Sequence, residues 1–199
     1  DAYLTPNGGP LNHLLEQGDP IAAMGQDFQH LTRARGGRTT PCEDGFIFPN
    51  TYSDWVPHFY IEDGCWRFGH TERGEKRPAE ILSTDRDTVL RWIAHELLNV
   101  MRFDKGWPSI LTYKTDPALL PGWQVQKLYD HYQHSNHGRL ISPDNIHLPM
   151  VMHTVFPRHE NLNTLSHLMP LTLTQVINSF LAEDGGNLHD ALDPTPAST

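Results

Sequence analysis

The sequence predicts an α+β domain in which an antiparallel β-meander packs against one long amphipathic helix, with additional shorter helices. Strand-length apolar segments separated by turn residues fill residues 45–82, and apolar residues at helical spacing follow them directly. Strands that precede helices in this way are typical of the α+β class. The 199 residues, 38% of them hydrophobic, suffice for one core. We place a single domain at residues 1–185 and expect a flexible tail over residues 186–199.

The first elements expected are a short helix over residues 21–33 and then the meander. Asp19 is the candidate N-cap of that helix, and Pro20 is its first residue. Asp63-Gly64 predicts a tight hairpin turn, and Arg73-Gly74-Glu75 a looser one. We expect the meander to bury one face and to leave the other face in water. The predicted strands are Phe46–Phe48, His58–Ile61, Cys65–Phe68 and Ala79–Leu82.

The long helix is expected from Thr84, its candidate N-cap, to Gly106. Apolar residues recur every four positions along it, which predicts a continuous stripe that packs on the meander. The stripe consists of Val89, Ile93, Leu97 and Met101.

Weaker patterns follow this helix. Residues 109–113 are a candidate strand, and residues 123–134 a candidate helix with Val125, Leu128, Tyr129 and Tyr132 on one side. Short strands are expected at residues 140–141 and 150–152, and a further helix at residues 173–182.

Charge and the length of the apolar segments exclude two classes of partner, nucleic acids and membranes. Lys and Arg number 15 against 24 Asp and Glu, a formal net charge of −9, whereas binding to a phosphate backbone requires clustered basic residues. No apolar segment approaches the roughly 20 residues that cross a bilayer. We therefore expect a cytoplasmic protein with no nucleic-acid or membrane partner. Cys42 and Cys65 are expected as free thiols, and a bridge between them only if the protein is exported.

The chain carries 13 histidines, but no pattern among them identifies an active site. His95-Glu96 resembles the start of a zinc-peptidase motif, yet Asn99 stands where the second histidine ligand belongs. His131 and His134 lie one helical turn apart and are the metal candidates, with a solvated polar face as the alternative reading. We therefore assign no catalytic residue, no cofactor and no resident metal.

One ordered set of motifs resembles a known family. Cys65-Trp66-Arg67-Phe68-Gly69-His70-Thr71-Glu72-Arg73-Gly74 precedes a strand, Ser83-Thr84-Asp85 opens the long helix, and Trp107-Pro108-Ser109-Ile110 and Leu120-Pro121-Gly122-Trp123 follow. This order, over about residues 60–125, resembles the actinobacterial immunity-protein family that includes the antitoxin to tuberculosis necrotizing toxin. The resemblance implies a non-catalytic inhibitor from a polymorphic toxin system, which binds a secreted NAD-hydrolysing toxin made by the same cell. NAD then belongs to the partner.

An inhibitor of this kind needs aromatic or arginine anchors, and acidic residues would complement a basic nucleotide cleft. The candidate partner-binding residues are Asp44, Tyr52, Asp54, Trp55, Glu62, Asp63 and Arg73, with Phe59 and Tyr60 as further aromatic anchors. The competing reading is that the aromatic residues fill the core and the acids lie in solvated turns. Two other functions stay open, a metal-dependent or histidine-based hydrolase and a non-catalytic adaptor.

Overall fold

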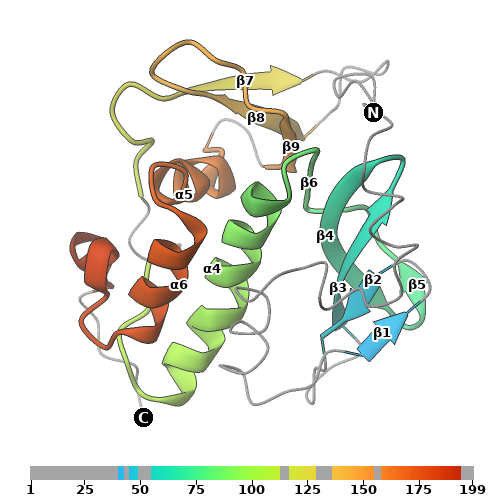
Figure 1. Cartoon of the computed structure of the whole chain (residues 1–199), viewed down its shortest axis with the longest axis horizontal. Helices are drawn as coiled ribbons and strands as arrows, with labels where there is room; N and C mark the ends of the chain where they lie inside the picture. The colour runs from blue at the N-terminus through green and yellow to red at the C-terminus, as the bar shows by residue number, and fades with distance from the viewer. Residues whose placement is uncertain are drawn as a thin grey trace.

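The computed structural model of the protein describes residues 40–42, 45–48, 55–112, 117–128, 136–154 and 158–193. Within these ranges the chain forms one antiparallel sheet of nine strands, three α-helices and a 3-10 helix (Figure 1). The expected α+β class is confirmed. The strands are β1 Thr40–Cys42, β2 Gly45–Ile47, β3 Trp55–Glu62, β4 Cys65–Glu72, β5 Glu75–Lys76, β6 Ile81–Ser83, β7 Gln124–Leu128, β8 His137–Ile141 and β9 Met150–His153.

The predicted meander is the first part of this sheet. β3 and β4 pair along eight residues each, from Trp55 opposite Glu72 to Glu62 opposite Cys65. Asp63 and Gly64 close the hairpin with φ angles of 52° and 72°, the left-handed pair that an Asp-Gly turn supplies. β6 then pairs with the other edge of β4. The turn prediction is therefore confirmed.

A second group of strands extends the sheet beyond the meander. β9 pairs with β6 and β8 with β9, so the order is β1-β2-β3-β4-β6-β9-β8-β7, with β5 beside β4. The short strands expected near residues 140 and 150 are confirmed. The helix expected over residues 123–134 is wrong for its described part, because β7 is a strand. Val125 packs on the main core and Leu128 belongs to a separate apolar cluster, so their spacing reflects opposite faces of a strand.

The long helix α4, Arg86–Asp104, begins one residue later than predicted. Asp85, not Thr84, is the N-cap, and its carboxylate accepts hydrogen bonds from the backbone N–H groups of Asp87 and Thr88. The residues of the expected apolar stripe are buried, and α4 packs on β4 and β6. Figure 1 shows α4 running between the β3–β4 ribbon and the helices α5 and α6. The helix therefore has core contacts on two sides.

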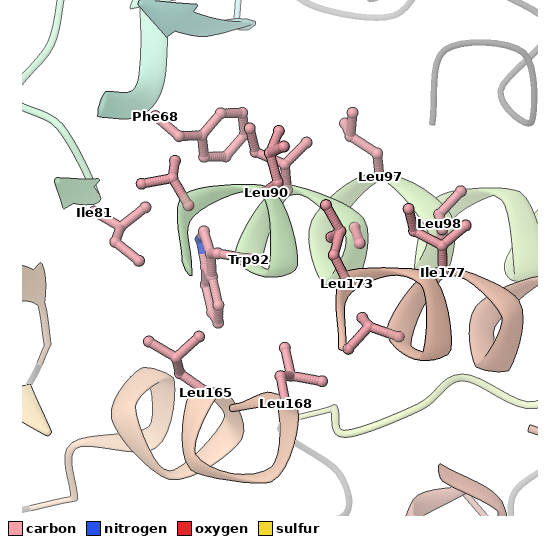
Figure 2. Packing of buried hydrophobic residues seen from close by; sticks show 14 of the residues in the cluster. Phe68, Ile81, Leu90, Trp92, Leu97, Leu98, Leu165, Leu168, Leu173 and Ile177 are labelled. Atoms are coloured by element: carbon pink, nitrogen blue, oxygen red, sulfur yellow. The ribbon is translucent and has the colours of Figure 1, made fainter. Parts of the chain in front are cut away.

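The main core lies around α4 (Figure 2). Phe68 and Ile81 approach the helix from the sheet, and Trp92 points from α4 toward Leu165. Leu165 belongs to α5, Glu160–Leu168, which the sequence patterns did not predict. The expected helix at residues 173–182 is confirmed as α6, Leu173–Leu181, with a capping box between Thr172 and Gln175.

The second face of the sheet departs from the expected wet surface. Cys65, Leu128 and Val151 are buried there as a small apolar cluster, with Leu82 packed against it. His58 and Tyr60 of β3 are buried as well. The expectation that one face of the meander lies in water is thus wrong for the meander residues His58, Tyr60 and Cys65. Cys65 is a free thiol, and burial raises its pKa.

The chain beyond α6 continues as the 3-10 helix η1, Gly186–Ala191. Leu188 is buried in the main core, and Leu192 forms a bridge to Ile110. The start of the segment expected as a flexible tail therefore packs on the domain. The expected helix at residues 21–33 and the last six residues lie outside the described ranges. In the described part of the chain, no helix combines the length and the apolar character needed to cross a membrane.

Candidate partner-binding surface

Two of the expected partner residues, Glu62 and Asp63, stand at the tip of the β3–β4 hairpin. Arg67 reaches both: its Nη1 lies 3.1 Å from Glu62 Oε2, and its Nη2 lies 3.3 Å from Asp63 Oδ2. The carboxylates stay accessible, since the Glu62 side chain is 49% exposed and that of Asp63 is 71% exposed. Arg67 itself is largely buried against the sheet. The tip thus presents two oriented carboxylates with one charge compensated.

Arg73 and Trp55 lie at the opposite end of the same ribbon. Trp55 pairs with Glu72, and Arg73-Gly74 turns the chain with φ angles of 51° and 81°. Eight residues of strand separate the two ends by about 26 Å. The structure therefore does not bring Arg73 together with Glu62 and Asp63. At the Arg73 end, the exposed Glu72 side chain pairs with Arg77 at 2.9 Å.

The two aromatic anchors that can be placed are not available for contact. Phe59 is fully buried and stacks on Trp66 at a ring distance of 5.2 Å. Tyr60 is buried too, and Lys76 Nζ lies 3.7 Å from the centre of its ring. For these residues the competing reading, that aromatic side chains fill the interior, is confirmed. Asp44, Tyr52 and Asp54 lie outside the described residues, as does the side chain of Trp55.

Three of the described histidines have separate local partners. His95 Nε2 lies 3.0 Å from the Leu111 carbonyl oxygen, and His167 Nε2 lies 2.8 Å from that of Ala118. His147 Nδ1 lies 3.1 Å from the Gln126 amide oxygen. Among the described residues, no group of three or more His, Cys, Asp or Glu side chains is arranged to hold a metal ion. The metal candidates His131 and His134 lie outside these ranges.

A buried carboxyl that the sequence patterns did not reveal lies where the meander meets α4. Glu80 Oε1 is 3.4 Å from His70 Nδ1, and both side chains are about three-quarters buried. Burial raises the pKa of Glu80 to about 7, the nearby Glu96 carboxylate contributes to the rise, and the Trp92 indole partly opposes it. Burial also lowers the pKa of His70. Near neutral pH the Glu80 carboxyl is therefore only partly ionised, and the His70 ring is mostly neutral.

Local sequence carried no signal for this cluster. Glu80 lies within a predicted strand segment, where an acidic residue reads as a solvent-facing position. Its burial depends on α4, which supplies Trp92 and Glu96. Perturbed carboxyl groups are common at functional sites, but structural clusters perturb pKa values too. A site of this kind becomes visible only once the helix is placed on the sheet.

Comparisons with known proteins find a matching family and a solved structure with a similar fold. The sequence model of the family described as Immunity protein 61 matches residues 31–188. The solved structure of Rv3902c from M. tuberculosis superposes with a TM-score of 0.63 at 15% sequence identity, over 82% of this chain and 92% of that one. At this identity the likeness shows a shared fold. No curated protein matches the sequence. The family match covers most of the chain and confirms the resemblance to an immunity-protein family, so this chain belongs to the Immunity protein 61 family.

Proposed function

We propose that this immunity protein binds a cognate secreted toxin that hydrolyses NAD and blocks its active site sterically. Membership of the immunity-protein family supports a role as the inhibitor of a toxin. The finer assignment to an NAD glycohydrolase rests on the resemblance of residues 60–125 to the family of the antitoxin to tuberculosis necrotizing toxin. In this proposal the chain performs no chemistry, and NAD is the substrate of the partner.

The tip of the β3–β4 hairpin supports the proposal most directly. A cleft that binds the pyrophosphate of NAD offers Arg or Lys side chains, which Glu62 and Asp63 complement in charge. Arg67 holds both carboxylates before binding, so their ordering costs less when the complex forms. The hairpin also belongs to the sheet that α4 braces from behind. A stiff acidic projection of this kind suits the entrance of a basic cleft.

The separation of the two ends of the ribbon limits what one cleft can accept. A typical interface covers about 800 Å² on each partner and is therefore roughly 28 Å across. One toxin molecule has room to touch both the Glu62–Asp63 tip and the Arg73 turn, but only one of them enters a cleft. The negative charge of the tip makes it the proposed plug. Arg73 and Trp55 are proposed as contacts at the edge, and Asp44, Tyr52 and Asp54 as further contacts.

The test combines this chain with the toxin domain encoded beside its gene and measures NAD consumption. A stoichiometric excess of the chain should abolish consumption. Asp63→Asn removes one carboxylate and keeps the turn, because Asn accepts a positive φ readily. We expect this variant to bind about tenfold more weakly at low salt and about equally at high salt.

Asp144→Asn is the matched control, since Asp144 is an exposed acid in the turn that follows β8. It should inhibit as well as the natural chain does. Unchanged NAD consumption with the natural chain in excess would remove the proposed function. Equal effects of the two substitutions would remove only the assignment of the hairpin tip.

A further inference from the structure

The outward face of α4 is covered over its first half and open over its second. Trp92, Glu96, Val100 and Phe103 follow at intervals of four, four and three residues, which places them on one side of the helix. Trp92 is buried and points toward Leu165 of α5 (Figure 2). Beyond it, Val100 is 44% exposed and Phe103 is 62% exposed. We name Val100 and Phe103 the open face of α4.

The exposure of the open face is unusual in the described part of the chain. Val100, Phe103 and Ile146 are the large hydrophobic residues exposed there, and Ile146 lies apart in the turn between β8 and β9. Two exposed apolar side chains one turn apart on a helix form a contiguous apolar contact, unlike a single scattered residue. Phe103 also has the size of an interface anchor.

A small pocket lies about one helical turn before the open face, at Glu96. Its volume is about 240 Å³, and Glu96, one turn before Val100, forms part of its wall. The Glu96 side chain is one-third exposed, and its Oε1 lies 3.1 Å from His95 Nδ1. Glu160, at the start of α5, is more exposed, and its Oε1 lies 3.6 Å from the highly exposed Arg158 Nη1. The wall includes Trp92, His95, Glu96, Leu111, Glu160 and Asn161.

We infer that the open face and this pocket together form a second contact surface for the toxin. The occupant is a toxin segment that places an apolar side chain on Val100 and Phe103 and a neighbouring Arg or Lys side chain in the pocket. Glu96 and Glu160 complement the cation, and the wall formed by Trp92 offers an aromatic ring to it. About 10 Å of helix separates Glu96 from Phe103, which one short segment spans. This inference rests on the proposed toxin partner.

A second copy of this chain fits the surface poorly. In a twofold dimer the same patch meets itself, so Glu96, Asp104 and Glu160 of one copy would approach those of the other. The chain as a whole carries a formal charge of −9, which adds to this repulsion. A basic partner meets the same carboxylates favourably. Charge complementarity therefore selects a cationic toxin surface over self-association.

The experiment measures the affinity of the full chain for the toxin domain encoded beside its gene, using biolayer interferometry. Phe103→Asp should weaken binding at least about thirtyfold, the loss expected of an anchor residue. Ile146→Asp is the matched control, because it makes the same kind of change at a similarly exposed site, and it should stay within about twofold. Phe103→Ala is the milder variant, and thermal melts of all three should overlay that of the natural chain.

The pocket is tested by Glu160→Gln against Glu183→Gln, an exposed control on the loop after α6. The first should weaken binding several-fold at about 50 mM NaCl and much less at about 500 mM, whereas the second should do neither. Affinity that is unchanged by Phe103→Asp and by Phe103→Ala would overturn the inference. The inference is also wrong if Phe103→Asp only dissociates an oligomer of the free chain.

The two proposals fail differently. If the natural chain binds the toxin domain tightly but leaves NAD consumption unchanged, the proposed inhibition is wrong while the variant affinities still test the open face. If inhibition occurs and the Phe103 variants bind normally, only the open face is wrong. Absence of any binding by the natural chain rejects both.

Discussion

Arg102 and Glu80 are both buried near α4, at its C-terminal end and beside its N-terminal half, but their surroundings differ. The Arg102 guanidinium donates hydrogen bonds to four backbone carbonyl oxygens, those of Pro108, Phe180, Ala182 and Glu183. Glu80 instead faces His70, Trp92 and a second carboxylate, Glu96. One charged group is thus surrounded by acceptors that suit it, and the other meets a like charge.

The difference shows when a buried ionisable group keeps its charge in this protein. Burial lowers the pKa of Arg102, yet arginine starts so high that it stays protonated and joins the end of α6 to α4. For Glu80, burial and Glu96 raise the pKa to about 7, so the carboxyl is largely neutral below that pH. Arg102 stabilises the domain from within, whereas Glu80 destabilises it when ionised. The groups proposed to contact the toxin are exposed.

The largest effect on stability is expected when the Arg102 guanidinium is removed. Arg102→Met removes every donor to the four carbonyl groups at the ends of α4 and α6, and we expect a loss of about 4 kcal/mol in the free energy of unfolding. Arg102→Lys keeps the charge but lacks the planar guanidinium, so its stability should lie between that of the natural chain and that of Arg102→Met. Urea denaturation at neutral pH measures both. A loss below about 1 kcal/mol for Arg102→Met would show that the hydrogen bonds of Arg102 contribute little to stability.

The next effect tests the charge state of Glu80. The pKa of Glu80 is higher in the folded than in the unfolded chain, so the protonated carboxyl is favoured by folding. The folded state is therefore most stable below the unfolded pKa near 4.5, and it loses this stability as the pH rises through about 7. The difference between the two pKa values corresponds to about 3 kcal/mol. Glu80→Gln cannot ionise, so relative to the natural chain it should gain about that much stability between pH 4.5 and about 8.

This gain is measured as the difference in unfolding free energy between variant and natural chain across the pH range. The His70 contribution to the pH dependence has the opposite sign, because its lowered pKa makes stability fall as the pH drops below 6.5. Both proteins contain His70, so the difference between them cancels this contribution where the substitution leaves the pKa of His70 unaltered. Glu96→Gln should reproduce part of the gain, because its charge is the second cause of the raised pKa. A difference that does not vary with pH would contradict the assignment.

A smaller effect concerns the start of α4. Asp85→Ala removes the acceptor for the N–H groups of Asp87 and Thr88 and should cost about 1 kcal/mol. Asp85→Asn keeps an oxygen in the same place and should cost only a few tenths. Thermal unfolding distinguishes the two variants. Equal losses for both would attribute the effect to charge at the helix end and not to the cap.

The smallest effect lies at the exposed C-terminal end of α4. Lys105 Nζ lies 4.3 Å from the centre of the Trp107 ring, and Lys105→Ala should cost about 0.5 kcal/mol, as expected for an exposed cation–π pair. Lys105→Arg should preserve the contact. Denaturation in parallel with Arg102→Met shows how much of the stability at this end depends on burial. A loss comparable with that of Arg102→Met would contradict the comparison.

Features that depend on local sequence were predictable. Asp63-Gly64 determines its turn through two positive φ angles, and the apolar stripe of α4 follows from its helical spacing. Val125 and Leu128 suggested a helix wrongly, because a spacing of three residues suits one face of a helix and also the two faces of a strand. Pairing of β7 with β8 decided between these readings. For the candidate partner-binding surface, the sequence predicted the Asp63-Gly64 and Arg73-Gly74 turns but not the distance between them. That distance depends on the pairing register of β3 and β4.

Short stretches of sequence were enough to predict the class of the fold, the hairpin turn, the long helix and the likeness to immunity proteins, because each depends on residues close together in the chain. The other features follow from the packing of distant segments. That packing placed β9 beside β6, buried Glu80 under α4 and left Phe103 exposed at the far end of the helix. Which distant segments pack together is a property of the whole core, and no local window of residues contains it.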